Sequence, residues 1–349
     1  MKQGSAGSRG PGVAGVRRRD EREQMKAEIL ALLRESEDYV SGQELCNRFG
    51  VSRSAVWKAV NQLKKEGYEI RAVQNRGYKL VRALDYGESE LRSRIHTAWA
   101  GSQLYFHQVT GSTNLLAKQA GERDAPHGAL FVAGEQTAGR GRRGRSWQSP
   151  PEANIYFTIL LRPGFSPDQA SMLTLVMAHS VAAAIHRLTG MEAGIKWPND
   201  VLLEDRKVCG ILTEMSLERE YIHYVVCGVG INVAPQVFPE EIREHVTTVE
   251  AAYGQPVSKG ALLQYVIEAF EQDYDAFAAA GDLSPLLDSY NGMLVNLGRG
   301  VRILDPKGEW EGTARGINTR GELLVEDAAG RVTAVYAGEV SVRGVYGYV

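Results

Sequence analysis

The sequence predicts an α+β protein made of three parts, and three observations lead to this expectation. A basic N-terminal segment shows the apolar spacing of helices and then the pattern of a short hairpin. Strands and helices alternate from about residue 91 to residue 280, and the last 55 residues hold short β-branched runs between turns. We therefore expect a flexible tail over 1–24 and three modules at 25–84, 85–294 and 295–349.

The composition is that of an ordinary globular protein, with 44% hydrophobic and 23% charged residues. The three cysteines are far apart and form no C-x-x-C pair, which argues against a disulfide framework or a zinc site and fits a reducing cytoplasm. The longest apolar stretch, 171–188, is interrupted by His179, Ser180 and His186. We expect a cytoplasmic protein with no membrane association.

The charge is distributed unevenly along the chain. Residues 1–82 hold 17 Lys and Arg against 10 Asp and Glu, whereas the remainder holds 23 against 32. This asymmetry predicts that the N-terminal module, and not the rest, faces a polyanion such as DNA.

The N-terminal module has the pattern of a winged helix-turn-helix. A first helix begins near Met25, Ser41 caps a short second helix, and Ser52 caps a third that ends at Gly67. Strand patterns over 68–73 and 78–81 flank the turn 75–77 and predict a β-hairpin wing.

In such a module the second helix of the motif enters the major groove and the wing contacts phosphates. The expected DNA-binding residues are Ser52, Arg53, Ser54, Trp57, Lys58, Arg76 and Lys79. A winged helix that serves only protein contacts is the alternative.

Polar residues gather where a predicted strand over 104–109 meets the next helix. Ser112, Thr113 and Asn114 stand at this helix N-terminus. They are suited either to capping alone or to holding a small polar ligand at the electropositive helix end.

A loop at 139–145 reads G-R-G-R-R-G-R. It contains G-x-G-x-x-G, but no apolar helix follows, and no G-K-[ST] closes it, so neither a Rossmann nor a Walker loop is expected. Four guanidiniums repel one another, which predicts a loop that becomes ordered only when a phosphate or carboxylate binds. A solvated basic loop, or additional nucleic-acid surface, is the alternative.

Two further motifs lie in the same module. Lys196-Trp197-Pro198-Asn199-Asp200 follows a short strand, where Lys196 is either a snorkelling surface residue or a positioned cation. Gly228-Val229-Gly230-Ile231-Asn232 ends another strand. Turn signals at 305–308, 318–321 and 327–330 then predict a small β-barrel.

The order of these motifs from Met25 to the C-terminus resembles that of the bifunctional biotin-protein ligases and biotin operon repressors. The resemblance implies a central mixed α/β domain like that of class II synthetases and an SH3-like C-terminal barrel. It also implies a two-step reaction, in which biotin and MgATP form biotinyl-5'-AMP and the acyl group then passes to a lysine of a biotin carboxyl carrier protein, for example that of acetyl-CoA carboxylase. The carrier lysine itself attacks, so no covalent nucleophile is needed.

The same resemblance implies the site residues. Biotin binding is implied for Ser112, Thr113, Asn114, Gln136, Arg140, Gly141, Arg142 and Lys196. The loop that folds over the adenylate also includes Gly139, Arg143, Gly144, Arg145 and Trp147. Contacts to ATP are implied for Lys196, Asn199, Asp200, Gly210 and Asn232, with Mg²⁺ entering with the nucleotide and not on dedicated protein ligands. Ser146 stands where some members of the family carry a lysine.

The family's regulation is implied as well: the adenylate favours a homodimer whose two winged helices bind operator DNA. Two other functions stay open, namely a ligand-sensing transcription factor without ligase activity and a lipoyl ligase of related fold.

Overall fold

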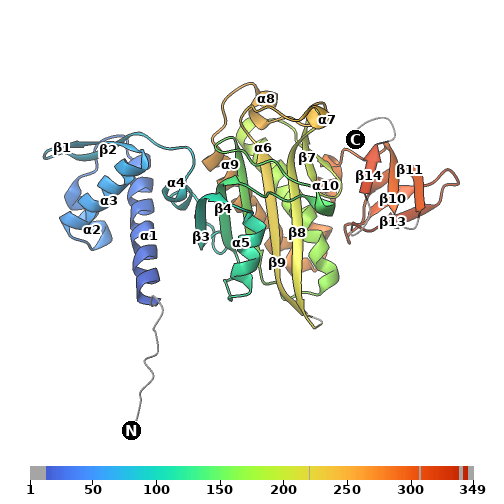
Figure 1. Cartoon of the computed structure of the whole chain (residues 1–349), viewed down its shortest axis with the longest axis horizontal. Helices are drawn as coiled ribbons and strands as arrows, with labels where there is room; N and C mark the ends of the chain where they lie inside the picture. The colour runs from blue at the N-terminus through green and yellow to red at the C-terminus, as the bar shows by residue number, and fades with distance from the viewer. Residues whose placement is uncertain (1–12, 220, 306–307, 338–340, 345–349) are drawn as a thin grey trace, which may run out of the picture. The chain divides into compact units, whose positions relative to one another are not determined.

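The computed structural model describes residues 13–219, 221–305, 308–337 and 341–344 and divides the chain into two compact units (Figure 1). The first ends at Arg94 and the second spans Ile95–Val349. The second unit includes both the central part and the C-terminal strands, which the sequence analysis had treated as separate modules.

The first unit confirms the predicted winged helix-turn-helix elements. Its elements are α1 (Val13–Glu35), α2 (Gly42–Phe49), α3 (Arg53–Glu66), β1 (Glu69–Val73), β2 (Gly77–Arg82) and α4 (Glu88–Arg92). The Ser41 hydroxyl accepts from the backbone N–H of Glu44 and the Ser52 hydroxyl from that of Ala55, as N-caps do. Helix α1 begins at Val13, inside the segment predicted to be a tail, and residues 1–12 of that segment lie outside the described residues.

A buried carboxylate attaches α4 to this unit. Glu90 is fully buried and accepts from Arg34 Nη2 at 2.7 Å and from Arg94 Nε at 2.6 Å. Burial raises the pKa of the nearby Tyr68, whose hydroxyl faces the same carboxylate. The unit therefore continues to Arg94, ten residues beyond the predicted boundary, because a buried charge must keep its partners.

A seven-stranded mixed sheet forms the centre of the second unit, in the order β3-β4-β5-β9-β8-β7-β6. Only β3 and β4 run parallel. The strands are β3 (Leu104–Thr110), β4 (Ala129–Gln136), β5 (Asn154–Leu161), β6 (Gly194–Lys196), β7 (Asp200–Leu203), β8 (Arg206–Glu218) and β9 (Tyr221–Asn232). Strand β5 is buried along its whole length.

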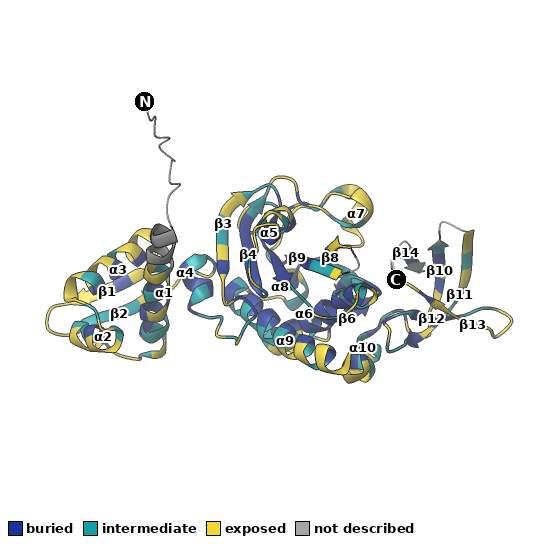
Figure 2. Ribbon diagram, turned by 90° about the horizontal axis from the view of Figure 1, so that it is seen from below, coloured by how far each residue is buried: buried dark blue, intermediate teal, exposed yellow. Residues whose placement is uncertain are grey.

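Helices cover both faces of this sheet (Figure 2). Helix α5 (Thr113–Gly121) packs against β4, β5 and β9, whereas α6 (Leu173–Thr189) and α9 (Lys259–Ala280) pack together as a pair that also contacts the sheet. The stretch Pro167–Thr189 is long and apolar enough to cross a membrane, but 67% of its apolar window is buried inside the domain, as in a core helix. The remaining helical elements are η1 (Arg142–Gly144), η2 (Pro167–Met172), α7 (Glu240–Arg243), α8 (Val249–Tyr253), η3 (Ser284–Leu286) and α10 (Leu287–Met293).

The C-terminal strands form an antiparallel sheet in the order β13-β12-β11-β10-β14. They are β10 (Gly300–Asp305), β11 (Gly308–Ile317), β12 (Leu323–Glu326), β13 (Val332–Val335) and β14 (Ser341–Gly344). Within the described ranges β13 and β14 do not pair, so the small sheet is confirmed while closure into a barrel is not. Trp197 Nε1 donates to Gly321 O at 2.9 Å, which attaches this sheet to the central domain.

Candidate functional site

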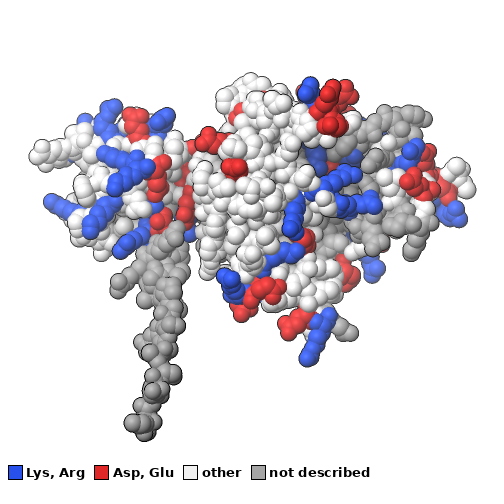
Figure 3. Space-filling model, in the orientation of Figure 1, with Lys and Arg blue, Asp and Glu red and all other residues white. Residues whose placement is uncertain are grey.

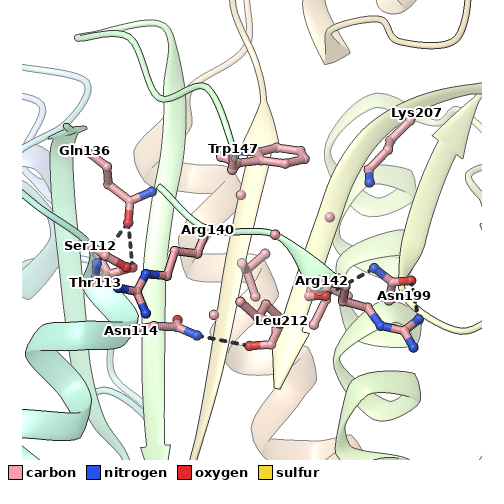
Figure 4. Close-up of a pocket in the computed structure, with 16 residues that line it drawn as sticks. Ser112, Thr113, Asn114, Gln136, Arg140, Arg142, Trp147, Asn199, Lys207 and Leu212 are labelled. Carbon is pink, nitrogen blue, oxygen red and sulfur yellow. Dashed lines mark hydrogen bonds between the residues drawn. The ribbon is translucent and has the colours of Figure 1, made fainter. Parts of the chain in front are cut away.

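A cavity opens between the N-terminus of α5, the arginine loop 139–147 and the centre of the sheet (Figure 4). Its free volume is about 50 Å³. The lining residues are Ser112, Thr113, Asn114, Gln136, Arg140, Gly141, Arg142, Trp147, Asn199, Lys207, Gly210, Ile211, Leu212, Gly228, Val229 and Gly230. Three motifs that are distant in the sequence thus meet at one place.

The polar end of the cavity is held by a network around Thr113. The backbone N–H of Thr113 donates to Gln136 Oε1 at 2.8 Å, and the Thr113 hydroxyl oxygen lies 3.1 Å from Gln136 Oε1 and 2.8 Å from the Thr158 hydroxyl oxygen. Ser112 occupies the N-cap position, but its hydroxyl makes no capping bond. Of the two alternatives for these residues, capping alone does not describe Ser112, because its side chain makes no capping bond and the residue lines the cavity.

Glycines on two neighbouring strands form the floor of the cavity. Gly210 pairs with Gly230, and Leu212 pairs with Gly228. A Cβ at Gly230 would lie 2.4 Å from Trp147 Nε1, and a Cβ at Gly228 would lie 1.9 Å from Asn114 Oδ1. The absence of side chains at these positions lets the indole and the amide approach the backbone of the sheet.

The arginine loop makes backbone hydrogen bonds within itself, and its ordering by an anion stays a prediction. Gly141 N donates to Arg145 O at 2.7 Å, and Trp147 N donates to Gly139 O at 2.9 Å. The indole ring of Trp147 lies over the glycine floor, and its centroid is 5.3 Å from Lys207 Nζ. Apolar contact of this ring anchors the loop and offsets the repulsion between its arginines.

Arg140 and Arg142 point in different directions within the cavity (Figure 4). Arg140 reaches toward Thr113 and Asn114. Arg142 donates to Asn199 Oδ1 at 3.0 Å and to Ala337 O at 2.7 Å. Burial lowers the pKa of Arg142 from its ordinary value, and the charge of Asp200 opposes this shift.

Arg142 also lines a second, larger cavity of about 320 Å³. Arg143, which has a left-handed backbone with φ of 57°, lines that cavity too. The other loop residues implied for the site, Gly144 and Arg145, are exposed, and Gly139 packs against Trp147 O.

Outside the arginine loop, three residues implied for the site are not among the described residues that line the first cavity: Lys196, Asp200 and Asn232. Lys196 is only 6% exposed on β6. Asp200 forms an ion pair with Lys207 at 2.6 Å, and the Asn232 amide donates to Thr247 O at 3.3 Å. Of these three side chains, Asp200 therefore contacts a residue that lines the cavity.

Sequence reasoning missed several residues of the site. Lys207 lines the cavity, while Thr158, Ser149 and Glu214 bind residues that do. The period of two along a strand offered a signal, since Glu214, Leu212 and Gly210 alternate on one face of β8. The hydrogen bonds themselves depend on the register between β5, β9 and β8, which the sequence does not give.

The first unit carries the residues expected to bind DNA. Ser52, Arg53, Ser54, Trp57 and Lys58 are exposed at the start of α3, and Trp57 is 59% exposed. Arg53 donates to Gln43 at 2.8 Å, and the wing residue Arg76 pairs with Asp38 at 3.1 Å, while Lys79 donates to Glu37 O. Figure 3 shows Lys and Arg side chains at several places on the visible face of this unit.

Known proteins share both the sequence and the architecture. Residues 106–232 match the Biotin/lipoate A/B protein ligase family, residues 26–79 match an HTH domain, and residues 297–343 match the biotin protein ligase C-terminal domain. The Bifunctional ligase/repressor BirA of Bacillus subtilis is 33% identical over 91% of this chain and 99% of its own length. That of Escherichia coli is 31% identical over 90% of this chain and 96% of its own length.

A solved structure shares its fold with a large part of this chain. The biotin protein ligase from Aquifex aeolicus in complex with biotin and ATP is 29% identical, with a TM-score of 0.62 over 70% of this chain and 99% of its own. The matches cover every module expected from the sequence. The chain belongs to the family of biotin protein ligases that includes the bifunctional ligase/repressor BirA proteins.

Proposed function

We propose that the chain is an ATP-dependent biotin-protein ligase that also represses transcription through its winged helix. The observation that carries the proposal is the single cavity at which the Ser-Thr-Asn turn, Gln136 and the arginine loop converge. Hydroxyl and amide groups at one end suit a ureido ring, and cations at the other suit a carboxylate and a phosphate.

In the first step the biotin carboxylate attacks the α-phosphorus of ATP, and the bond to the β-phosphate oxygen breaks to release pyrophosphate. Two anions must approach each other, so the barrier is largely electrostatic. Arg142 and Lys207 line the cavity and can neutralise these charges. Lys196, buried on β6, pairs with the carboxylate and the α-phosphate in this proposal once the cavity has enlarged.

In the second step the amine of the carrier lysine attacks the acyl carbon, AMP leaves and the amine loses a proton. Magnesium enters with the phosphates of ATP and adds to the charge neutralisation. No residue of the chain becomes covalently modified.

The loop must move for this reaction to occur. The free volume of about 50 Å³ is far below the roughly 300–1,000 Å³ of small-molecule pockets. Because Arg142 lines both this cavity and its 320 Å³ neighbour, displacement of Arg142 would join the two. We expect Trp147 to leave the glycine floor as the nucleotide enters and to close over it afterwards.

The regulatory part of the proposal concerns DNA and a homodimer. In the adenylate-bound state a second copy of the chain forms a dimer, and its two winged helices bind two operator half-sites. The exposed start of α3 supplies the base contacts and Arg76 those to phosphate. The carrier protein competes with the second copy, so repression reports that acceptor is exhausted. The proposed compartment is the cytoplasm.

The experiment is to incubate the purified chain with radiolabelled biotin, MgATP and a biotin carboxyl carrier domain. Biotin-dependent pyrophosphate exchange and labelled carrier are expected. A parallel reaction with lipoate and a lipoyl domain tests the alternative of a lipoyl ligase, which would label that domain instead. A shift of operator DNA in a gel without transfer of biotin to the carrier would favour a transcription factor without ligase activity.

A further inference from the structure

A single carboxylate on β8 binds two side chains on one face of α5. Glu214 Oε2 accepts from Asn114 Nδ2 at 2.9 Å, and Glu214 Oε1 accepts from Lys118 Nζ at 2.7 Å. Asn114 and Lys118 are four residues apart, so they lie one above the other on the helix surface. Two bonds one turn apart fix the rotation of the helix about its own axis as well as its position.

The amide of Asn114 has a defined orientation. Its nitrogen donates both to Glu214 and to Leu212 O, the latter at 3.3 Å and visible in Figure 4. Its oxygen accepts from the fully buried Thr158 hydroxyl at 2.6 Å. Both N–H groups are therefore used, and the amide holds the helix to the sheet instead of being free to donate to a ligand.

The carboxylate of Glu214 and the amine of Lys118 reach solvent, whereas Asn114 is buried. Asn114 is 6% exposed, but the side chains of Glu214 and Lys118 are 28% and 35% exposed. Burial favours the neutral form of Glu214, yet hydrogen bonds from Lys118 and Asn114 hold the pKa of this carboxyl below 4.5. Because the side chains of Glu214 and Lys118 both reach solvent, a substitution that removes the charge of one leaves the charge of the other in contact with water.

We propose that Glu214 and Lys118 are positioning residues that fix the first turn of α5 against β8 and thereby orient Ser112 and Thr113 toward the polar ring of the acid substrate. The proposal rests on the proposed function for the identity of that substrate. Glu214 is not among the residues that line the first cavity, and it acts there through Asn114 and the helix. Its effect on the first cavity is consequently at the polar end, whereas Glu214 and Arg142 both line the second cavity.

The test compares steady-state kinetics of the full chain with those of Glu214→Gln, Lys118→Met and Lys118→Arg. For the first two we expect a roughly tenfold rise in the KM for biotin, as the loss of a charge-assisted hydrogen bond implies, with kcat and the KM for ATP nearly unchanged. Lys118→Arg keeps a cation at this place and should give a smaller rise. Glu268→Gln, which breaks the Arg187–Glu268 pair between α6 and α9, is the matched control and should match the parent.

Hydrogen–deuterium exchange over 113–121 gives a second readout that requires no catalysis. Faster exchange in Glu214→Gln and Lys118→Met, but not in Glu268→Gln, supports the proposal. Parental exchange together with a parental KM for biotin would overturn it, and so would an equal rise in the KM for biotin and the KM for ATP that accompanies a lower unfolding temperature. If the parent itself fails to transfer biotin, the proposed function is lost, while the exchange measurement still decides whether this carboxylate fixes the helix.

Discussion

A methyl group at Gly228 should damage both folding and biotin binding. The Cβ of Gly228→Ala would lie 1.9 Å from Asn114 Oδ1 and 2.7 Å from its Cγ. The amide cannot move away without breaking its bonds to Thr158 and Glu214. The substitution therefore combines overpacking with the loss of buried hydrogen bonds.

The expected cost follows from these two terms. Overpacking costs about 1–3 kcal/mol, and each of the two broken hydrogen bonds costs about 1 kcal/mol, so we expect a loss of about 3–5 kcal/mol. In a unit of this size that corresponds to an unfolding temperature roughly 6–20 °C lower. Displacement of Asn114 also disturbs the first turn of α5, so biotin affinity should fall by roughly tenfold or more.

Calorimetry of thermal unfolding and titration of biotin measure the two effects. Gly164→Ala is the matched control, since a Cβ there meets no atom within 4 Å and the backbone is not left-handed. Parental stability and parental affinity in Gly228→Ala would refute the reasoning, because they would mean that Asn114 is not held where the structure places it.

Other substitutions test separate parts of the proposal. Lys196→Ala should abolish biotin-dependent pyrophosphate exchange, and near-normal exchange would remove this lysine from the mechanism. Arg142→Ala should release biotinyl-5'-AMP into solution, which chromatography of the reaction mixture detects; an intermediate retained as tightly as in the parent contradicts the loop's role. Removing residues 1–94 should eliminate operator retardation in a gel and leave ligase turnover, whereas a persisting shift would place the DNA reader elsewhere. Because the folded pKa of Glu214 lies below 4.5, its ionisation stabilises the fold above about pH 4.5 and this contribution declines as pH falls through the folded pKa. Glu214→Gln should flatten that part of the stability profile in acid unfolding experiments, and an unchanged slope would contradict the assignment.

The sequence predicts the elements of the fold well because local signals mark them. Ser41, Ser52 and Gly67 cap the helices that they were expected to cap, and turns separate the predicted C-terminal strands. The sequence does not predict the boundary at Arg94, since the ion pair between Arg34 and Glu90 joins residues more than fifty positions apart. An ion pair between residues so far apart produces no periodic pattern in the sequence.

The candidate site was predictable in its motifs but not in its geometry. The Ser-Thr-Asn turn, Gln136 and the arginine loop do meet at one cavity, yet Lys196 lies behind the lining and Lys207 lies in it. Which of two lysines faces a cavity depends on strand register and on the hairpin β7-β8. The ordering of the loop depends on Trp147 packing over glycines that lie more than sixty residues further along the chain.

The bare backbone at Gly210, Gly228 and Gly230 has a consequence for how the protein can change. On one side of β9, Gly228 and Gly230 carry no side chains, while Cys227 and Ile231 on the other side are buried. The same strand thus leaves space for a guest molecule on one surface and supplies apolar packing through the other. Residues around the guest can be exchanged to alter which molecule is accepted, because the packing that keeps the domain folded lies on the opposite side of the strand.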